Sequence, residues 1–164
     1  MVLKQFYEAL AGVIQNKTLT GVKSTSGNSM NLATSYANMI MQFSKGMATV
    51  AGSSYTSPGC VVFGTGDKAV AFDDYRLSRD QITTLSGSGT VNCSFDDTGF
   101  TASSLLTVTN NGSTDVTIRE IGLVMQATGN WYYLVDRTIL DSPLTVPAGG
   151  IGQVVYTIRM NYPT

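Results

Sequence analysis

The chain has 164 residues, of which 43% are apolar and only 13% are charged, and its formal net charge is −1. This length fits one domain with an appended arm and can bury a hydrophobic core without disulfides or metals. The chain has no histidine, which excludes Ser-His-Asp triads, other histidine-based acid–base catalysis and most zinc sites. The small net charge argues against a nucleic-acid-binding surface, which needs clustered Lys and Arg.

The N-terminal segment predicts a short amphipathic helix. Its apolar side chains recur at three- and four-residue spacing, at Leu3, Phe6, Tyr7, Leu10, Val13 and Ile14. A helix of this length is marginal alone, so its apolar stripe needs a partner, either the chain's own β-domain or a neighbouring subunit. Glu8 interrupts the segment, so it does not predict a signal peptide, and no apolar run in the chain reaches transmembrane length.

The next forty residues carry no clear pattern. Residues 15–29 are polar and rich in Gly, Ser and Thr, which predicts an extended connection. Residues 30–47 fit both a helix and a strand, and residues 51–59 predict a loop. We therefore expect residues 1–58 to form an N-terminal helix and assembly arm. This arm has four lysines and one glutamate, net +3, whereas residues 59–164 have six basic and ten acidic residues, net −4. Opposite net charges favour contacts between copies of the chain.

From Cys60 onward the pattern is that of short strands separated by turns. Strands are predicted at 60–63, 82–85, 90–95, 100–110, 116–126, 131–140, 142–146 and 151–162. The SGSG segment at 86–89 predicts a turn, and Asn110-Asn111-Gly112-Ser113 predicts a hairpin between its flanking strands. Residues 59–164 are thus expected to form a mainly β domain. Its predicted architecture is an antiparallel β-sandwich, jelly-roll or immunoglobulin-like, with the N-terminal helix and extended arm attached.

One irregularity interrupts the alternation of the segment 116–162. Val116 and Ile118 occupy one phase, whereas Ile121 and the alternate apolar residues after it occupy the other. Either a β-bulge lies at Arg119-Glu120, or Glu120 faces inward and needs a partner. Arg137 is the best candidate partner and Arg76 the next. We interpret Glu120 and Arg137 as a structural ion pair that fixes strand register and not as a catalytic pair.

No motif predicts a catalytic residue, a cofactor or a metal. Several aspartates lie close together in the sequence, but their spacing does not match a calcium-binding loop. They are Asp67, Asp73, Asp74, Asp80, Asp96 and Asp97. Gly64-x-Gly66 lacks the third glycine and the Lys-Ser/Thr of a phosphate-binding loop, so we interpret it as a turn. Cys60 and Cys93 allow one disulfide but match no metal spacing, and we expect free, buried thiols if the protein is made and assembled in the cytosol.

An aromatic run offers a possible binding surface. Trp131-Tyr132-Tyr133 lies at the start of a predicted strand. Trp131 and Tyr133 have the same phase and would form an exposed aromatic contact for a sugar if they face solvent. Alternating aromatic residues in a strand are more often core residues with one exposed ring, so both readings stay open.

The C-terminal part of the chain resembles small virion proteins of tailed bacteriophages. Four segments carry the resemblance in order: CVVFGTGDKAVAFDDYRL, LLTVTNNGSTDVTIREIGLVM, WYYLVDRTILDSPLTVPAGG and GQVVYTIRMNY. They extend over about residues 60–162, and residues 1–58 have no counterpart. The resemblance implies a structural component and not an enzyme, in the capsid decoration, neck or tail, located in the virion after assembly in the host cytoplasm. It implies a homo-oligomer that contacts copies of itself and other virion proteins, with Leu3–Ile14 as the anchor and no membrane or nucleic-acid readout.

Two other functions are weighed against this one. The first is a carbohydrate- or receptor-binding β-sandwich module of a phage or bacterium, which would use Trp131–Tyr133. The second is a small hydrolase, which without histidine would need a pair of carboxylates. Among eleven acidic residues some such pair is always possible, so its presence is no evidence for a hydrolase. We therefore rank the hydrolase last.

Overall fold

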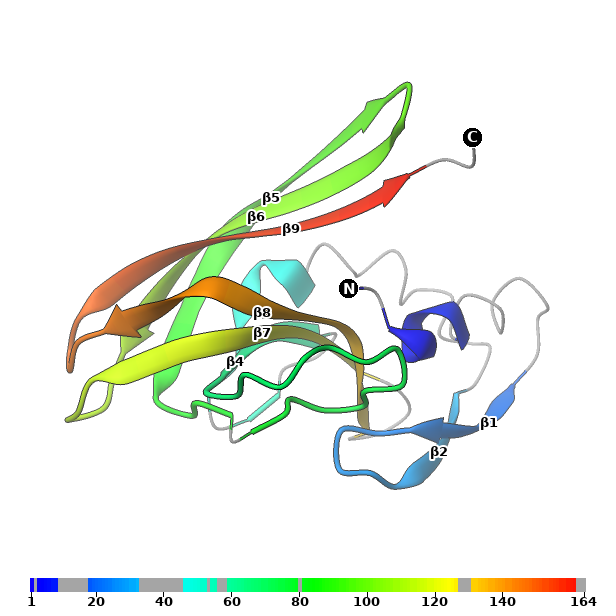
Figure 1. Ribbon diagram of the computed structural model, residues 1–164, viewed down its shortest axis with the longest axis horizontal. Helices are drawn as coiled ribbons and strands as arrows, with labels where there is room; N and C mark the ends of the chain where they lie inside the picture. Colours follow the sequence, from blue (N-terminus) through cyan, green and yellow to red (C-terminus); the bar gives the residue numbers. More distant parts are fainter. Residues whose placement is uncertain are drawn as a thin grey trace.

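The protein is almost entirely β-structure in the computed structural model, which describes residues 1, 3–8, 18–32, 46–52, 54–55, 59–79, 81–126 and 131–161. A short helix at residues 4–8 precedes the strands (Figure 1). The prediction of a mainly β chain is therefore confirmed. None of the helices in these ranges is long and apolar enough to cross a membrane.

The strands form two sheets of unequal size. Strands β1 (Leu19–Lys23) and β2 (Ser29–Leu32) pair as a small antiparallel hairpin. The other seven form one sheet in the order β8-β7-β4-β3-β5-β6-β9. They are β3 (Thr49–Val50), β4 (Gly59–Gly64), β5 (Leu85–Asp96), β6 (Gly99–Asn110), β7 (Val116–Gln126), β8 (Tyr132–Val146) and β9 (Ile151–Asn161).

The large sheet consists of two three-stranded halves joined by a very short strand. Val50 of β3 pairs in parallel with Val61 of β4 and antiparallel with Gly87 of β5. The sheet curls until its edge strands β8 and β9 approach one another, so it is nearly a closed barrel. The prediction of an antiparallel sandwich does not describe this mixed sheet. The difference arises because β3, which belongs to the predicted arm, bridges the two halves by hydrogen bonds.

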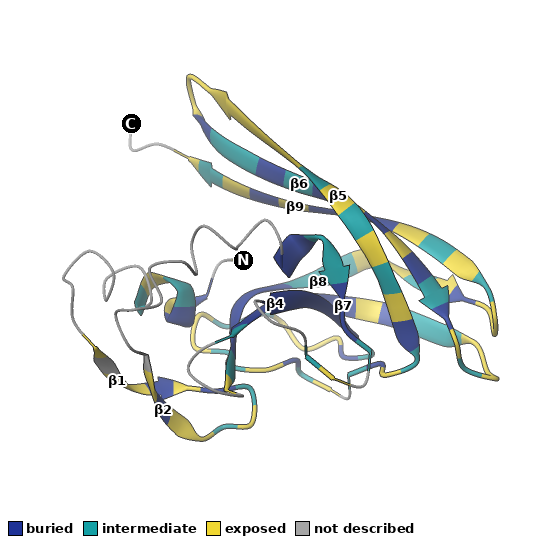
Figure 2. Cartoon of the chain, turned by 180° about the vertical axis from the view of Figure 1, so that it is seen from behind, coloured by how far each residue is buried: buried dark blue, intermediate teal, exposed yellow. Residues whose placement is uncertain are grey.

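The main hydrophobic core lies between the two halves. Leu123 and Val135 approach it from β7 and β8, whereas Leu106 and Ile158 approach it from β6 and β9. A second layer covers the opposite face of β4, β7 and β8, and consists of Leu3, Ala51, Cys60, Val62, Leu77, Val124 and Leu134. This second layer explains why β4 is buried on both faces. In Figure 2 β4 is buried throughout and β7 is buried from Glu120 to Met125, whereas β6 and β9 alternate between buried and more exposed residues.

Two of the predicted breaks between strands are wrong. The SGSG segment is the interior of β5, where Gly87 and Gly89 pair with Val108 and Leu106 of β6. A Cβ atom on Gly87 would lie 2.0 Å from the Thr107 carbonyl oxygen, so glycine permits a close approach of two strands and not a reversal of the chain. Likewise, Ser142 lies within β8, which continues where two strands were predicted.

The predicted hairpin at residues 110–113 is also wrong. Strand β6 pairs with β5 and β9, whereas β7 pairs with β4 and β8, so this connection crosses from one half of the sheet to the other. The buried Asn110 side chain holds the crossing in place. Its amide nitrogen donates to the carbonyl oxygens of Thr114, Val146 and Pro147 at 2.8–3.1 Å. A backbone–side-chain network therefore replaces the expected two-strand turn.

The N-terminal segment contacts the sheet directly. The Leu3 amide donates to the Val135 carbonyl oxygen at 2.8 Å, and the Leu3 side chain is buried in the second layer. Phe6 packs against the main core, and Tyr7 is exposed. The remaining predicted stripe residues, Leu10, Val13 and Ile14, lie outside the described residues. The predicted boundary at residue 58 falls between β3 and β4, which belong to the same sheet.

Candidate functional site

A fully buried carboxylate lies on β7. The register of β7 against β8 shifts between Ile118 and Glu120, so the two alternatives considered for the phase break occur together: a bulge, and an inward-facing glutamate. Glu120 faces the segment 65–79 and accepts hydrogen bonds from the amides of Gly66 at 3.1 Å, Ser78 at 3.0 Å and Arg79 at 3.1 Å. The Ser78 hydroxyl also donates to it, at 3.1 Å. These donors compensate the loss of solvation of a buried charge.

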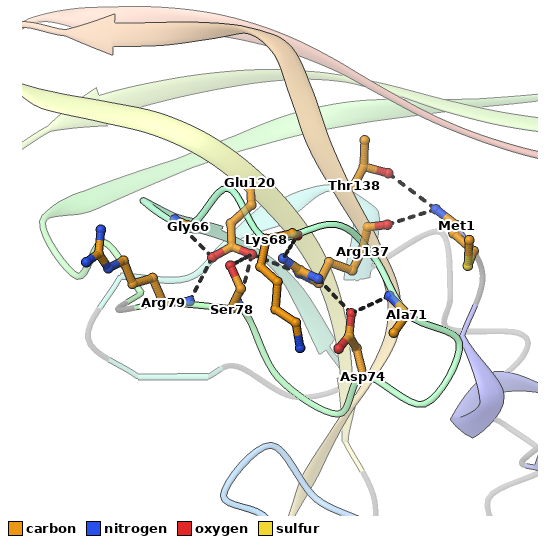
Figure 3. Close-up of polar contacts among 10 residues, drawn as sticks. All are labelled: Met1, Gly66, Lys68, Ala71, Asp74, Ser78, Arg79, Glu120, Arg137 and Thr138. Carbon is orange, nitrogen blue, oxygen red and sulfur yellow. Dashed lines mark hydrogen bonds and ion pairs between the residues drawn. The ribbon is translucent and has the colours of Figure 1, made fainter.

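Arg137 lies beside Glu120 on the neighbouring strand. Its Nε atom is 2.8 Å from Glu120 Oε2, and both side chains are 0% exposed. Its two terminal nitrogens donate to Asp74 Oδ2 at 2.6 Å and to the Lys68 carbonyl oxygen at 2.7 Å (Figure 3). The structure therefore brings together the two residues that the sequence paired, and adds Asp74 as a second carboxylate. We call Asp74, Glu120 and Arg137 the ion cluster.

The glycines of the Gly64-Thr65-Gly66 segment make room for the ion cluster. A Cβ atom on Gly66 would lie 1.9 Å from Ser78 Oγ and 2.4 Å from Glu120 Oε1. A Cβ atom on Gly64 would lie 2.7 Å from the same carboxylate oxygen. The segment that the sequence presents as a turn is thus the wall of the Glu120 site. The absence of side chains lets its backbone approach the carboxylate.

A second buried carboxylate joins the two edge strands. Asp136 of β8 accepts a short hydrogen bond from the Tyr156 hydroxyl of β9, and both residues are buried. Burial raises the pKa of Tyr156 well above its usual value, and the neighbouring Asp136 raises it further, so the phenol remains the donor. The Met1 amino group lies 3.0 Å from Asp136 Oδ1. Asp136 and Tyr156 were not identified from the sequence, although an Asp-Arg pair inside an apolar run was a signal.

The ion cluster connects distant parts of the fold, and its Glu120–Arg137 pair is fully buried. It connects the segment 65–79 to β7 and β8 through Glu120 and Arg137, which are 0% exposed, and through Asp74, whose side chain is 15% exposed. Each of the two carboxylate oxygens of Glu120 accepts at least two hydrogen bonds. A general acid or base must come within hydrogen-bond reach of a substrate, and Glu120 has no such access.

Two hollows lie next to the ion cluster. One, of about 160 Å³, has an apolar floor that includes Val62 and Leu134, with Arg76 and Arg79 in its lining and no carboxylate. The other, of about 290 Å³, is lined by the 68–78 segment and includes Asp73 and Asp74. Arg76, the second candidate partner of Glu120, lies instead over the Tyr75 ring at 5.4 Å. Within the described ranges, no group of three His, Cys, Asp or Glu residues is arranged to hold a metal.

In the aromatic pair and in the cysteine pair, one residue is exposed and the other is buried. Trp131 is 41% exposed, whereas Tyr133 is 2% exposed and burial raises its pKa. The two residues therefore do not form a shared exposed surface. Cys60 and Cys93 are both free thiols; Cys60 is buried, but Cys93 is exposed on β5, so the expectation of two buried thiols is wrong for Cys93.

A three-stranded ribbon presents the main exposed surface. We define the ribbon as β5, β6 and β9, which extend beyond the other half of the sheet (Figure 1). It carries four large apolar side chains that are exposed, and these are Phe95, Leu105, Ile151 and Val155. Strand register places Leu105, Ile151 and Val155 on one face of the ribbon and Phe95 on the other. Exposed apolar side chains that share one face are typical of a surface that binds a partner.

Comparison with known proteins identifies no relative. No family model, no curated protein and no solved structure matches this chain.

Proposed function

We propose that this protein is a structural subunit of a tailed-bacteriophage virion, in the capsid decoration, neck or tail, and that it acts as a homo-oligomer without enzymatic activity. The observation that carries the proposal is the ribbon, which extends beyond the core and exposes Phe95, Val155 and Ile151 at 73%, 68% and 68%. Leaving such side chains in water costs free energy that a partner recovers on binding. The resemblance of residues 60–162 to tailed-phage virion proteins supports the choice of assembly.

The position of the charged groups supports a structural role. The carboxylates that are most strongly held, Glu120 and Asp136, are buried and connect strands and segments far apart in the sequence. A subunit that holds its neighbours must keep its shape under load. Buried and fully bonded polar groups favour one arrangement of the strands over its alternatives.

The proposal is tested on purified particles. Virions from a phage that encodes this chain are examined by mass spectrometry and by cryo-electron microscopy, and the recombinant chain is examined by gel filtration. We expect the chain in stoichiometric amounts in the particle, and density for a β-domain at repeated positions. Its absence from particles, with the gene still required for growth, would refute a virion role.

One alternative has an observation in its favour. Trp131 is exposed and lies beside Tyr132, whose ring contacts Tyr55 with centroids 4.8 Å apart. Such a ring would allow a carbohydrate- or receptor-binding module. A glycan array with the wild type and Trp131→Ala distinguishes the two functions, because specific binding that is lost in the variant would support the binding module and not the structural subunit.

A further inference from the structure

The ribbon has an outer face that turns away from the main core. Strand register places directly opposed residues on the same side, and the inner positions of β6 and β9 are buried, as at Leu106 and Tyr156. Eighteen alternate positions of β5, β6 and β9 therefore form the outer face. They are Ser86, Ser88, Thr90, Asn92, Ser94, Asp96, Gly99, Thr101, Ser103, Leu105, Thr107, Thr109, Ile151, Gln153, Val155, Thr157, Arg159 and Asn161.

The outer face carries almost no charge. Asp96 and Arg159 are the two charged residues among these eighteen, all of them described, and they form an ion pair with one another at 3.2 Å at the end of the ribbon. A nucleic acid would need unpaired cations, and an acidic or basic protein would need the opposite charge. None of these eighteen residues is aromatic, so the face has no ring to stack on a sugar or a base.

The middle of the outer face is apolar. Leu105 of β6 lies directly opposite Val155 of β9, and they are 46% and 68% exposed. The rows on either side are polar and uncharged: Ser88, Thr107 and Gln153 form one, and Asn92, Ser103 and Thr157 form the other. A sheet face in contact with water is normally polar throughout. An apolar centre with a neutral polar margin is the composition of a subunit interface.

We propose that the outer face is a self-association surface, on which a second copy of the chain packs sheet against sheet about a two-fold axis. A two-fold contact presents the same patch to itself, so a single-sign charged patch would repel its copy, and this neutral patch does not. Two such sheets pack about 10 Å apart with strands rotated by about 30°. The inference rests on the proposed function for its setting, since it names the surface through which that homo-oligomer forms.

The area of the outer face sets the expected strength of the contact. Three strands of about twelve residues measure about 40 Å by 14 Å. Two copies would then bury about 1,100 Å², which is at the lower limit for a specific interface. We therefore expect a reversible dimer with a dissociation constant in the micromolar range in solution. The high local concentration in an assembled particle would strengthen it.

The test uses charge at the centre of the outer face. Sedimentation velocity is measured for the wild type, Leu105→Lys and Leu105→Glu over a range of concentrations. We expect each variant alone to dimerise at least about ten-fold more weakly, because like charges meet across the two-fold axis. An equimolar mixture of the two variants should recover dimers. Phe72→Lys is the matched control, because Phe72 is similarly exposed but lies outside the ribbon, and it should dimerise as the wild type does.

The outcomes separate this inference from the proposed function. Circular dichroism melts show whether the variants are folded, which we expect because Leu105 is exposed. A wild type that stays monomeric up to about 1 mM would overturn the inference, and so would Leu105 variants that associate like the wild type. If the Leu105 variants remain monomeric but still enter particles, the virion role stands and this surface does not build the particle. If the chain is absent from particles, the dimer measurement still stands on its own.

Discussion

Arg137 of β8 donates from its Nε atom to Glu120 of β7 at 2.8 Å, with both side chains fully buried. Removing one member of a buried ion pair destabilises a fold strongly, because the other charge stays buried and loses that partner. The pair therefore makes the fold sensitive to the loss of one partner.

Arg137→Met should lower the free energy of unfolding by about 3–5 kcal/mol, because it leaves Glu120 and Asp74 without their cation. Chemical denaturation measures the loss. Arg119→Met is the matched control, since Arg119 is the exposed arginine next to Glu120, and it should change the denaturation midpoint little. Equal effects of the two substitutions would show that burial of the pair does not matter for stability.

Gly66→Ala should destabilise the protein by about 1–3 kcal/mol through overpacking. The new methyl group would lie 1.9 Å from Ser78 Oγ, and the carboxylate of Glu120 blocks its other side. Gly152→Ala is the comparison, because its nearest neighbour is a Val146 methyl group at 3.1 Å, which needs to move only slightly. Thermal melts that show the same transition temperature for both variants would contradict the role of Gly66.

Tyr156→Phe should cost about 1–3 kcal/mol, because Oδ2 of the buried Asp136 loses the Tyr156 hydroxyl as its donor, while the Met1 amino group stays beside Oδ1. Tyr7→Phe, at an exposed tyrosine, should leave the free energy of unfolding unchanged. The two variants are compared by denaturation at neutral pH. An unaffected Tyr156→Phe protein would mean that Asp136 obtains its stabilisation elsewhere.

The same tyrosine predicts a loss of stability in alkali. Its pKa in the folded protein is raised above 10.0, so the stabilising contribution is present below pH 10 and is lost as the pH rises further. Absorbance of tyrosinate should show a group in the folded wild type that ionises only together with unfolding. That late phase should become smaller in Tyr156→Phe.

Asp96 predicts a local change in acid. Hydrogen bonds from the Thr98 hydroxyl and amide, together with Arg159, lower its pKa to about 2. Because the folded pKa lies below the ordinary value of 3.8, the contribution is present above about pH 4 and is lost as the pH falls towards 2. Carboxyl NMR titration should give a midpoint near 2, and Thr98→Val should raise it. Thr98→Ser, which keeps the hydroxyl, should preserve the low midpoint; an unchanged midpoint in Thr98→Val would exclude the hydroxyl as the cause.

The two thiols should react at different rates. Cys93 is exposed and Cys60 is buried, so a thiol reagent should label Cys93 in the native protein and Cys60 only after local or global opening. Mass spectrometry of peptides from a labelling time course measures both rates. In denaturant the two rates should become similar, which serves as the control. Fast labelling of Cys60 in the native protein would contradict its burial in the second layer.

The sequence by itself determined the local features of this protein. The alternation of Val154, Tyr156 and Ile158 predicts β9 because one face of a strand must be buried, and the structure buries all three. The phase break at Arg119-Glu120 predicts a bulge or an inward carboxylate. An inward carboxylate needs a partner, because an unpaired buried charge is too costly. Arg137 could be named as the partner because it lies in an apolar run of the following strand.

Only the tertiary structure decided which strands pair and what the glycines do. β6 pairs with β5 and β9 and not with β7, and the two-residue β3 joins the halves of the sheet. The sequence does not predict this order, because strand pairing depends on long-range contacts that no local pattern records. Gly87 and Gly66 look like turn residues in the sequence, since the lack of a Cβ serves a turn and a close approach equally well. Asp74 and Tyr156 became partners of buried charges only when distant segments met, so the cluster and the outer face of the ribbon are properties of the folded chain.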